Sequence, residues 1–489
     1  MINPAVSANR GSISTDPVAL TIDHSVKLDD TNSEFLHNTF GSAGNTRKFT
    51  ISFWHQRTQL GLNSNQGTES GERLFDWWTG SVGTSCLFTA DDKLIFDLNA
   101  GSNYSTSIHH FRDPLAWYHI VLAVDTTQSG AADRVNIYVN GEESVDANSN
   151  KFGDWNAYIG QNTDLAWNTA NRLDIGRFHN NDSFVGGHFA EFISVDGAQK
   201  EATDFGMVDE DTGQWIPIEY AGTFGTNGFR LDFDNASGLG DDESGNDHDF
   251  SLNQLAAIDQ SSSTPTNNFC KINSLMNQGL VAFDVRSGGT RVTTGSNISH
   301  VGSMALTSGK WYWEGVQTSV TGTNYVRMGV SAVDADQGDS ADPLGNAYTG
   351  WYTGDNAFHQ TTSQSAYNVS YNIGWTGMSA GTVWSISLNC DTNPYQMTIR
   401  KDNSIPGTAG NNTNRSVGTY IGNTKAVYPI SVIYANSSSD TYHNFGCPHV
   451  SALAGGNADG NGYGNFKYAP PSGYYAICTK NLAQYGGDG

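Results

Sequence analysis

The chain has 489 residues, which is enough for two or three domains that each bury a hydrophobic core. It contains 55 glycines against 12 prolines, 11% aromatic residues and only 15% charged residues, where about 25% charged residues is typical of soluble domains. Acidic residues outnumber basic ones by 49 to 25, so the formal net charge is -24 at pH 7. A surface of this sign repels phosphate, and because no basic cluster reverses it locally, nucleic acid is not expected as a partner.

No stretch approaches the roughly 18 apolar residues of a membrane-spanning helix, so membrane insertion is not expected. Residues 1–10 lack the basic start and the apolar core of a secretory signal, and we therefore expect a soluble product of the cytoplasm. The five cysteines are widely spread, odd in number and without a C-x-x-C pair. We interpret them as buried thiols rather than as a disulfide framework or a zinc site.

Short runs rich in β-branched and aromatic residues follow residue 20, separated by clusters of Gly, Asn, Asp and Ser. Asn140-Gly141 is the dipeptide that a type I′ turn requires, because both central residues of that turn have positive φ. Regular short strands with turn signals between them predict an antiparallel β-sandwich. The predicted strands are Ser25–Leu28, Lys48–Trp54, Arg73–Asp76, Lys93–Asp97, Trp117–Val124, Arg134–Val139, Arg172–Ile175 and His188–Val195.

Five of these segments also carry a family resemblance. F-T-I-S-F-W, W-Y-H-I-V-L-A-V-D, V-N-I-Y-V-N-G, L-D-I-G and F-A-E-F-I-S-V-D-G-A occur in that order, and the series resembles concanavalin A-like jelly rolls of the laminin G type. The most specific part is the pair W-Y-H-I-V and Y-V-N-G, which are neighbouring strands in that fold. The resemblance covers roughly residues 20–200 and implies one β-sandwich, which we place at residues 21–215.

Residues 216–284 are predicted to form an acidic hairpin and a connector. F-R-L-D-F-D followed by D-E-S-G-N-D-H-D-F resembles the opening hairpin of many jelly-roll modules, and this places the start of a second unit near Gly228. The polar run S-S-S-T-P-T-N-N at residues 261–268 contains a proline and reads as a connector.

A second family resemblance begins after the connector. G-K-W-Y-W-E, R-M-G-V-S, Y-P-I-S-V and N-F-G occur in the order typical of SPRY (B30.2-like) domains, which implies a second β-sandwich over residues 285–446. Residues 1–20 are then an N-terminal arm and residues 447–489 a C-terminal tail. The expected fold class is all-β, with two antiparallel β-sandwich (jelly-roll) modules between the arm and the tail.

The order of the modules suggests a function. A laminin-G-type module, a D-x-S-G-N hairpin, a P-T-N-N-F connector, a SPRY-like module and a P-P-x-G-Y segment together resemble virion fibre and appendage proteins of tailed phages, particularly marine ones. That resemblance implies a structural protein of the virion, a tail or head fibre or appendage, assembled in the host cytoplasm and exposed on the particle. Its partners would be other virion proteins and a host-surface glycan or protein receptor, and a homo-oligomer is left open. The alternatives are a cellular adhesin, a protein-interaction protein and a polysaccharide-degrading enzyme.

Catalytic residues are not expected. Glycoside hydrolases with this jelly roll place two carboxylates across the scissile bond, about 5 Å apart in retaining enzymes, and the E-x-D-x-x-E motif that sets them on one strand face is absent. The nearest pair, Glu191 and Asp196, would point to opposite faces of a regular strand. We therefore predict that the protein is not an enzyme.

The acidic segment after residue 230 leaves two interpretations open. Calcium takes six to eight oxygen ligands from Gly-, Asn- and Asp-rich loops, so Asp232, Asp234, Asp242 and Asp247 are candidate calcium ligands. Their spacing does not match the EF-hand loop, and the alternative is a solvated acidic hairpin. No other cofactor is expected.

Aromatic residues near predicted turns are the candidates for ligand binding. An exposed aromatic face stacks on a sugar ring while neighbouring Asn and Asp side chains bind its hydroxyls. Tryptophans inside predicted strands, such as Trp54, Trp117 and Trp313, are expected in the cores. The predicted ligand-binding residues are Trp77, Trp78, Trp155, Trp167, Trp351 and Tyr352.

Overall fold

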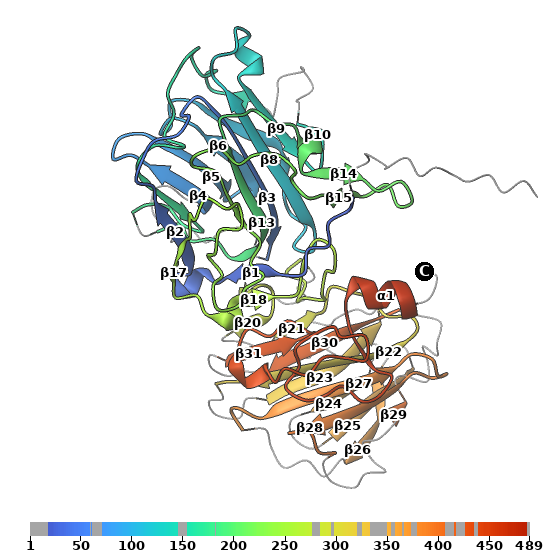
Figure 1. Ribbon diagram of the computed structural model, residues 1–489. Helices are drawn as coiled ribbons and strands as arrows, with labels where there is room; N and C mark the ends of the chain where they lie inside the picture. Colours follow the sequence, from blue (N-terminus) through green and yellow to red (C-terminus); the bar gives the residue numbers. More distant parts are fainter. Residues whose placement is uncertain are drawn as a thin grey trace, which may run out of the picture.

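The protein consists of two β-sandwich modules, one above the other in Figure 1, in a computed structural model. No helix within the described part of the chain has the length and apolar character needed to cross a membrane. The structure describes residues 18–58, 60, 71–144, 154–180, 182–275, 284–294, 298–319, 325–332, 350–353, 357–363, 366–372, 379–405, 415–416, 426–434 and 439–486.

The first module is a sandwich of two antiparallel sheets. Sheet I has the order β10-β9-β8-β3-β13-β1-β18, with β16 also paired to β13, and sheet II has the order β11-β7-β6-β5-β4-β12-β2-β17. The strands of sheet I are β10 (Glu142–Glu143), β9 (Val135–Val139), β8 (Trp117–Asp125), β3 (Lys48–Arg57), β13 (Gly187–Asp196), β1 (Ser25–Leu28), β18 (Gln260–Ser261) and β16 (Phe229–Leu231). Those of sheet II are β11 (Asp154–Trp155), β7 (Tyr104–His110), β6 (Lys93–Asp97), β5 (Gly83–Thr89), β4 (Gly71–Trp78), β12 (Arg172–Ile175), β2 (Phe35–Thr39) and β17 (Ser251–Asn253).

Alternation along β3 explains how sheet I packs. Phe49, Ile51 and Phe53 are fully buried in the core between the two sheets, since alternate residues of a strand face the same side. Trp54 lies on the opposite, outer face, in a small cluster with Ile22. Residues 198–224 cover part of this outer face and include a two-stranded ribbon, β14 (Gly206–Val208) and β15 (Trp215–Pro217).

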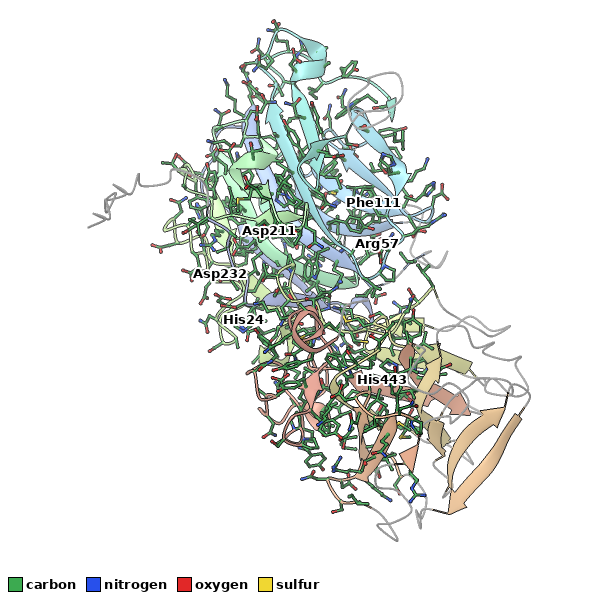
Figure 2. All side chains as sticks on the ribbon, turned by 90° about the vertical axis from the view of Figure 1, so that its right-hand side faces the viewer. His24, Arg57, Phe111, Asp211, Asp232 and His443 are labelled. Atoms are coloured by element: carbon green, nitrogen blue, oxygen red, sulfur yellow. The ribbon has the colours of Figure 1, made fainter. Side chains whose placement is uncertain are left out.

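A buried ion cluster joins the two sheets of the first module. Arg57, at the end of β3, is 0% exposed and pairs with Glu72 of β4 and with Asp92 at 3.2 and 3.0 Å. Its guanidinium also donates to the carbonyl oxygen of Phe111, and Figure 2 shows the two residues side by side in the first module. The arginine therefore stabilises the contact between the two sheets only while its ion pairs with Glu72 and Asp92 are intact.

The first module extends further than its predicted boundary at residue 215. Strand β16 pairs with β13, β17 with β2, and β18 with β1. The predicted opening hairpin at residues 229–250 is therefore part of the first sandwich and not the start of a second unit. The sequence signal failed here because these strands are only two or three residues long and their partners lie far back in the chain.

The second module also contains two sheets. Sheet III has the order β19-β20-β31-β22-β27-β28-β29, with β32 pairing parallel to β22, and sheet IV has the order β21-β30-β23-β24-β25-β26. The strands of sheet III are β19 (Asp284–Arg286), β20 (Arg291–Thr294), β31 (Ser439–Asn444), β22 (Lys310–Gln317), β27 (Val383–Asn389), β28 (Gln396–Lys401), β29 (Arg415–Ser416) and β32 (Tyr475–Ala476). Those of sheet IV are β21 (Ile298–Val301), β30 (Val427–Tyr434), β23 (Tyr325–Ala332), β24 (Gly350–Thr353), β25 (Ala357–Ser363) and β26 (Ala366–Asn372).

The core of the second module contains Trp311, Trp313 and Trp384, as expected for strand tryptophans. Phe269 bridges to Cys478, and Cys270 and Ile272 belong to the same buried clusters as sheet III. This module therefore begins near residue 269 rather than at 285. The described helices of the two modules are short: η1 (Asp30–Asn32), η2 (Ala131–Asp133), η3 (Ala202–Asp204), η4 (Ala257–Asp259), η6 (Ser451–Leu453) and α1 (Thr479–Tyr485).

The predicted C-terminal tail is an integral part of the second module. Phe466 and Cys478 are buried against Tyr312 of β22. The buried carboxylate of Glu314 accepts hydrogen bonds from the backbone N–H groups of Lys467 and Tyr468, at 2.8 and 2.9 Å. Residues 447–486 are therefore part of the fold, and the expectation of a separate tail is wrong.

Replacing Glu314 with Gln should loosen this C-terminal segment. Both carboxylate oxygens accept hydrogen bonds, including one from the Tyr312 hydroxyl, so an amide nitrogen would face donors and leave buried N–H groups unpaired. We expect a loss of about 1–3 kcal/mol in the free energy of unfolding, measured by urea denaturation, with faster proteolysis after residue 446. Glu243→Gln, at an exposed position, is the control. Equal stability of the two variants would contradict the proposed anchoring.

Candidate functional site

A cleft lies on the outer face of sheet I. Its volume is about 670 Å³, and its walls come from β3, β8, the β9–β10 turn, the β14–β15 ribbon and the connector between the modules. Its lining residues are Trp54, Leu115, Ala116, Trp117, Val139, Asn140, Gly141, Glu142, Val208, Gly213, Gln214, Trp215, Pro265 and Asn268.

Three aromatic rings form a stack beside this cleft. The His119 ring lies 4.8 Å from Trp54 and 6.0 Å from Trp215, with interplanar angles of 29° and 24°. The Trp215 indole N–H donates to Nδ1 of His119 at 2.9 Å. Because an indole is a donor only, His119 carries its proton on Nε2, where it donates to the Ser52 hydroxyl at 2.9 Å. These bonds fix the Trp215 ring as one wall of the cleft.

Two glycines allow the Trp215 ring to sit close to the backbone. A Cβ at Gly141 would lie 2.3 Å from the ring, and one at Gly206 would lie 2.5 Å from it. Asn140 and Gly141 have φ angles of 50° and 82°, so the predicted turn with two positive-φ residues is confirmed. The Asn140-Gly141 turn thus closes the β9–β10 hairpin and also leaves space for the Trp215 ring in the wall of the cleft.

The polar side chains of the cleft are mostly neutral amides. Asn140 and Gln214 are exposed, and Asn268 donates to the carbonyl oxygen of Leu115 at 2.8 Å. Glu142 is the one ionisable residue among the described residues that line it. Half-buried Trp117 and Trp215 supply apolar surface next to these amides. The cleft therefore offers aromatic faces together with hydrogen-bond donors and acceptors, and Glu142 is the single carboxylate of its described lining.

Two of the predicted ligand-binding tryptophans lie in the core. Trp77 and Trp167 are 0% exposed, and their rings pack 4.8 Å apart between the sheets. A ligand cannot stack on either ring, so the prediction for these two residues is wrong. Strand β4 continues through Trp78, so Trp77 and Trp78 are neighbours in a strand and must face opposite sides.

Trp78 and Trp155 are half-buried, and no contact in the structure tests the binding role predicted for them. Trp78 stacks on His179 with 4.1 Å between the ring centroids, and Trp155 packs near Tyr158. In sheet II they are separated by β7, β6 and β5, so they do not form one site. Trp351 and Tyr352 are in β24, but their side chains lie outside the described part of the structure, and their binding role stays a prediction.

The acidic segment is organised by its own hydrogen bonds. Asp242 accepts from the backbone N–H groups of Arg230, Ser244 and His248, each at 2.9 Å. Asp234 pairs with His24 at 2.9 Å. Figure 2 shows Asp232 and His24 on the same side of the first module.

These aspartates do not gather around a common point. Among the described His, Cys, Asp and Glu residues, the group of three with ligand atoms within 4.8 Å of one another is Glu34, Asp259 and His449. The predicted ligands Asp232, Asp234, Asp242 and Asp247 do not belong to it. Calcium binding at these four residues stays a prediction that their geometry does not favour.

The carboxylates of Glu191 and Asp196 both have structural partners, an arginine for Glu191 and backbone N–H groups for Asp196. Glu191 is at a β-bulge, with φ of 46°, and forms a two-pronged ion pair with Arg230 at 2.9 Å. Asp196 accepts from the backbone N–H groups of Asn45 and Asn227. These contacts account for both carboxylates without a catalytic role.

The expectation that Trp54 and Trp117 lie in the core is wrong, because both side chains are on the outer face of sheet I and Trp117 is half-buried. The sequence contained a signal for this placement that the predictions did not use. In F-T-I-S-F-W, the inward residues are Phe49, Ile51 and Phe53, so the phase of the alternation places Trp54 on the outer face with Thr50 and Ser52. The same alternation in β8 places Trp117 and His119 outward. Trp215 follows a turn and could only be assigned to the cleft once the ribbon was placed over sheet I.

No protein-family model matches the chain, and no curated protein matches it. Among solved structures, domains LG4-5 of the mouse laminin alpha1 chain are 11% identical, with a TM-score of 0.28 and coverage of 89% of each chain. The SPRY domain of human HERC1 is 14% identical, with a TM-score of 0.25, 36% of this chain covered and 97% of that domain. A SAP-like pentraxin from Limulus polyphemus is 17% identical, with a TM-score of 0.26, 37% of this chain covered and 80% of the pentraxin chain.

Laminin G and SPRY domains, which the sequence motifs resemble, thus occur among the similar solved structures. None of the three is a virion protein, so the phage origin stays a prediction. The strand order defines an all-β protein of two sandwiches, and the cleft on sheet I is lined by aromatic and amide side chains. These identities and TM-scores assign no function to this chain.

The stack at His119 leads to a pH prediction. Burial lowers the pKa of His119 from 6.5 to about 3. Below pH 6.5 the unfolded chain therefore takes up a proton that the folded protein excludes, and stability is lost as the pH falls from about 6.5 toward 3. At pH 4 this one residue should cost about 3 kcal/mol.

His119→Gln should remove this one contribution of about 3 kcal/mol from the pH dependence, because Gln can still accept from Trp215 and donate to Ser52 without titrating. The other buried histidines keep their contributions. The measurement is the free energy of unfolding between pH 7 and pH 4 for both proteins. His109→Gln, at an exposed position, is the matched control and should keep the wild-type slope. Identical slopes for all three proteins would show that His119 is not buried as a neutral ring.

Proposed function

We propose that the protein is a non-catalytic binding protein whose outer-face cleft, between Trp117, Trp215 and the connector, binds a glycan. The observation that carries this proposal is the combination of half-buried indole rings with neutral amides in one open cleft of about 670 Å³. Sugar rings present apolar C–H faces and many hydroxyls, which match indole faces and amide groups respectively.

The charges around the cleft support a neutral ligand. No Lys or Arg is among its described lining residues, and Glu142 adds a negative charge to a chain of net charge -24. An anionic ligand would be repelled. The described residues of the cleft include a single carboxylate, whereas glycoside hydrolysis requires an acid pair, and this supports binding without cleavage.

The proposed setting is a phage virion, in which the chain is a tail or head fibre or appendage that presents this cleft to a host-surface receptor. The support is the order of modules in the sequence. In this proposal other virion proteins are partners, and lysis releases the assembled particle. A cellular adhesin with the same cleft is the second candidate.

Binding is tested with the purified full-length protein on an array of neutral and acidic oligosaccharides, followed by titration calorimetry on the best ligand. Trp215→Ala should weaken binding about 5- to 30-fold, since a stacked ring contributes about 1–2 kcal/mol. Gln214→Ala, at an exposed position, should weaken it about 2- to 10-fold by removing a hydrogen bond.

Trp78→Ala is the matched control, because Trp78 is also a half-buried tryptophan but lies on sheet II. It should leave the affinity unchanged. If Trp78→Ala lost as much affinity as Trp215→Ala, the binding site would not be the outer-face cleft. Release of reducing ends from the bound glycan would overturn the non-catalytic assignment.

The virion setting has its own test. Mass spectrometry of purified phage particles that encode this chain should detect it as a stoichiometric component, and antibodies against the second module should label the particle surface. Finding it only in lysate fractions that lack particles would favour the adhesin alternative, without affecting the glycan experiment.

A further inference from the structure

A group of buried acidic side chains lies between the two modules. Glu34 follows η1 and Asp259 ends η4 in the first module, while His449 follows β31 in the second. Each offers one ligand atom, and these atoms lie within 4.8 Å of one another. Glu34 and Asp259 are each 3% exposed. Side chains from both modules therefore converge at one enclosed point.

His449 is flanked by a carboxylate on each side of its ring. Its Nε2 lies 3.5 Å from Asp29 Oδ2, and its Nδ1 lies 3.7 Å from Asp259 Oδ1. A neutral imidazole has one N–H for these two carboxylates. One ring nitrogen must therefore direct its lone pair at a carboxylate oxygen, which is unfavourable unless a positive charge lies between them.

The position of that charge follows from the contacts of the two nitrogens. His449 Nδ1 is buried and has no hydrogen-bond partner, and the side chain is 6% exposed. Asp29 is held by Thr31, whose N–H and hydroxyl both donate to Oδ1, and by the Ser287 hydroxyl. It is thus placed to accept the Nε2 proton. A histidine whose other nitrogen donates to a carboxylate is the arrangement that orients imidazole ligands toward metals.

The local charges leave room for a divalent cation. Three carboxylates, those of Asp29, Glu34 and Asp259, face one ammonium, that of Lys27. The ammonium donates to the carbonyl oxygens of Ile258 and Pro448 at 3.0 and 2.8 Å. With all groups ionised, the excess is two negative charges. A divalent cation between these enclosed side chains would balance that excess.

We propose that a divalent transition metal of the zinc class binds between the modules, ligated by Glu34, Asp259 Oδ1 and His449 Nδ1, with water completing the coordination. Imidazole together with carboxylates suits zinc, whereas calcium and magnesium prefer oxygen ligands alone. Because the ligands come from both modules, the metal fixes the second module against the first. Asp29 orients His449 from outside the coordination sphere and acts as a positioning residue.

The test uses the full-length protein, stripped with a chelator and dialysed. Addition of Zn²⁺ should give one tightly bound ion per chain by elemental analysis and should raise the unfolding temperature. Co²⁺ in its place should give visible d–d absorption, which reports a specific coordination sphere in the wild-type protein without relying on any variant. Absence of stoichiometric metal and of the cobalt absorption would overturn the proposal and leave a proton as the occupant.

Variants locate the site. His449→Gln and Asp259→Asn should each weaken Zn²⁺ binding at least tenfold in titration calorimetry, and Asp29→Asn should weaken it about 10- to 100-fold through loss of orientation. His24→Gln is the matched control, because His24 forms a His–Asp pair with Asp234 on the surface at 2.9 Å. Loss of binding in His24→Gln with binding retained in His449→Gln would place the ion elsewhere and refute the proposal.

Discussion

The relative position of the two modules depends on the hydrogen bonds that the buried ammonium of Lys27 donates to both of them. Lys27 is 1% exposed and is held by one carbonyl oxygen from each module, those of Ile258 and Pro448. Desolvating an ammonium costs several kcal/mol, which only well-placed acceptors and nearby carboxylates offset. A shift of one module would leave this charge unpaired, so the contact tolerates little variation in geometry.

The shape of the outer-face cleft also depends on the position of the two modules. One of its walls is the connector, where Asn268 accepts from Gln56 at 3.2 Å and donates to Leu115 O. Three residues later, the buried ammonium of Lys271 donates to the Ser263 hydroxyl at 2.6 Å. Polar contacts at Ser263 and Asn268 therefore help to fix the connector in place. The shape of the cleft depends on how the modules are joined as well as on sheet I.

The fold class could be predicted from the sequence because strand periodicity is a local signal. The prediction for Arg172–Ile175 agrees with β12, and the Asn140-Gly141 turn lies between β9 and β10 as expected. The extent of the first module could not be predicted in this way. Residues 251–253 and 260–261 become strands only because β2 and β1 offer free edges, and such pairing leaves no periodic pattern in segments so short.

The candidate site was harder to predict than the fold. A tryptophan has the same local appearance whether it faces the core or solvent, and only the phase of its strand separates Trp77 from Trp78. The alternation of β3 and β8 was enough to place Trp54 and Trp117 on the outer face. The position of Trp215 depends on the β14–β15 ribbon, which packs on the outside of sheet I. The group of Glu34, Asp259 and His449 could not be predicted from the sequence. Its members come from both modules and are not spaced in any recognisable ligand motif.

The pairing of β1 with β18 also governs how the chain is made. Ser25 lies opposite Ser261, so the edge of β1 stays open until the ribosome has added more than two hundred residues. At about 5–20 residues per second this takes roughly 10–50 s. During that interval the nascent chain exposes an unpaired strand edge, which is a template for pairing between chains on neighbouring ribosomes. Production of this protein at high yield is therefore expected to depend on the rate of translation and on chaperones that shield that edge.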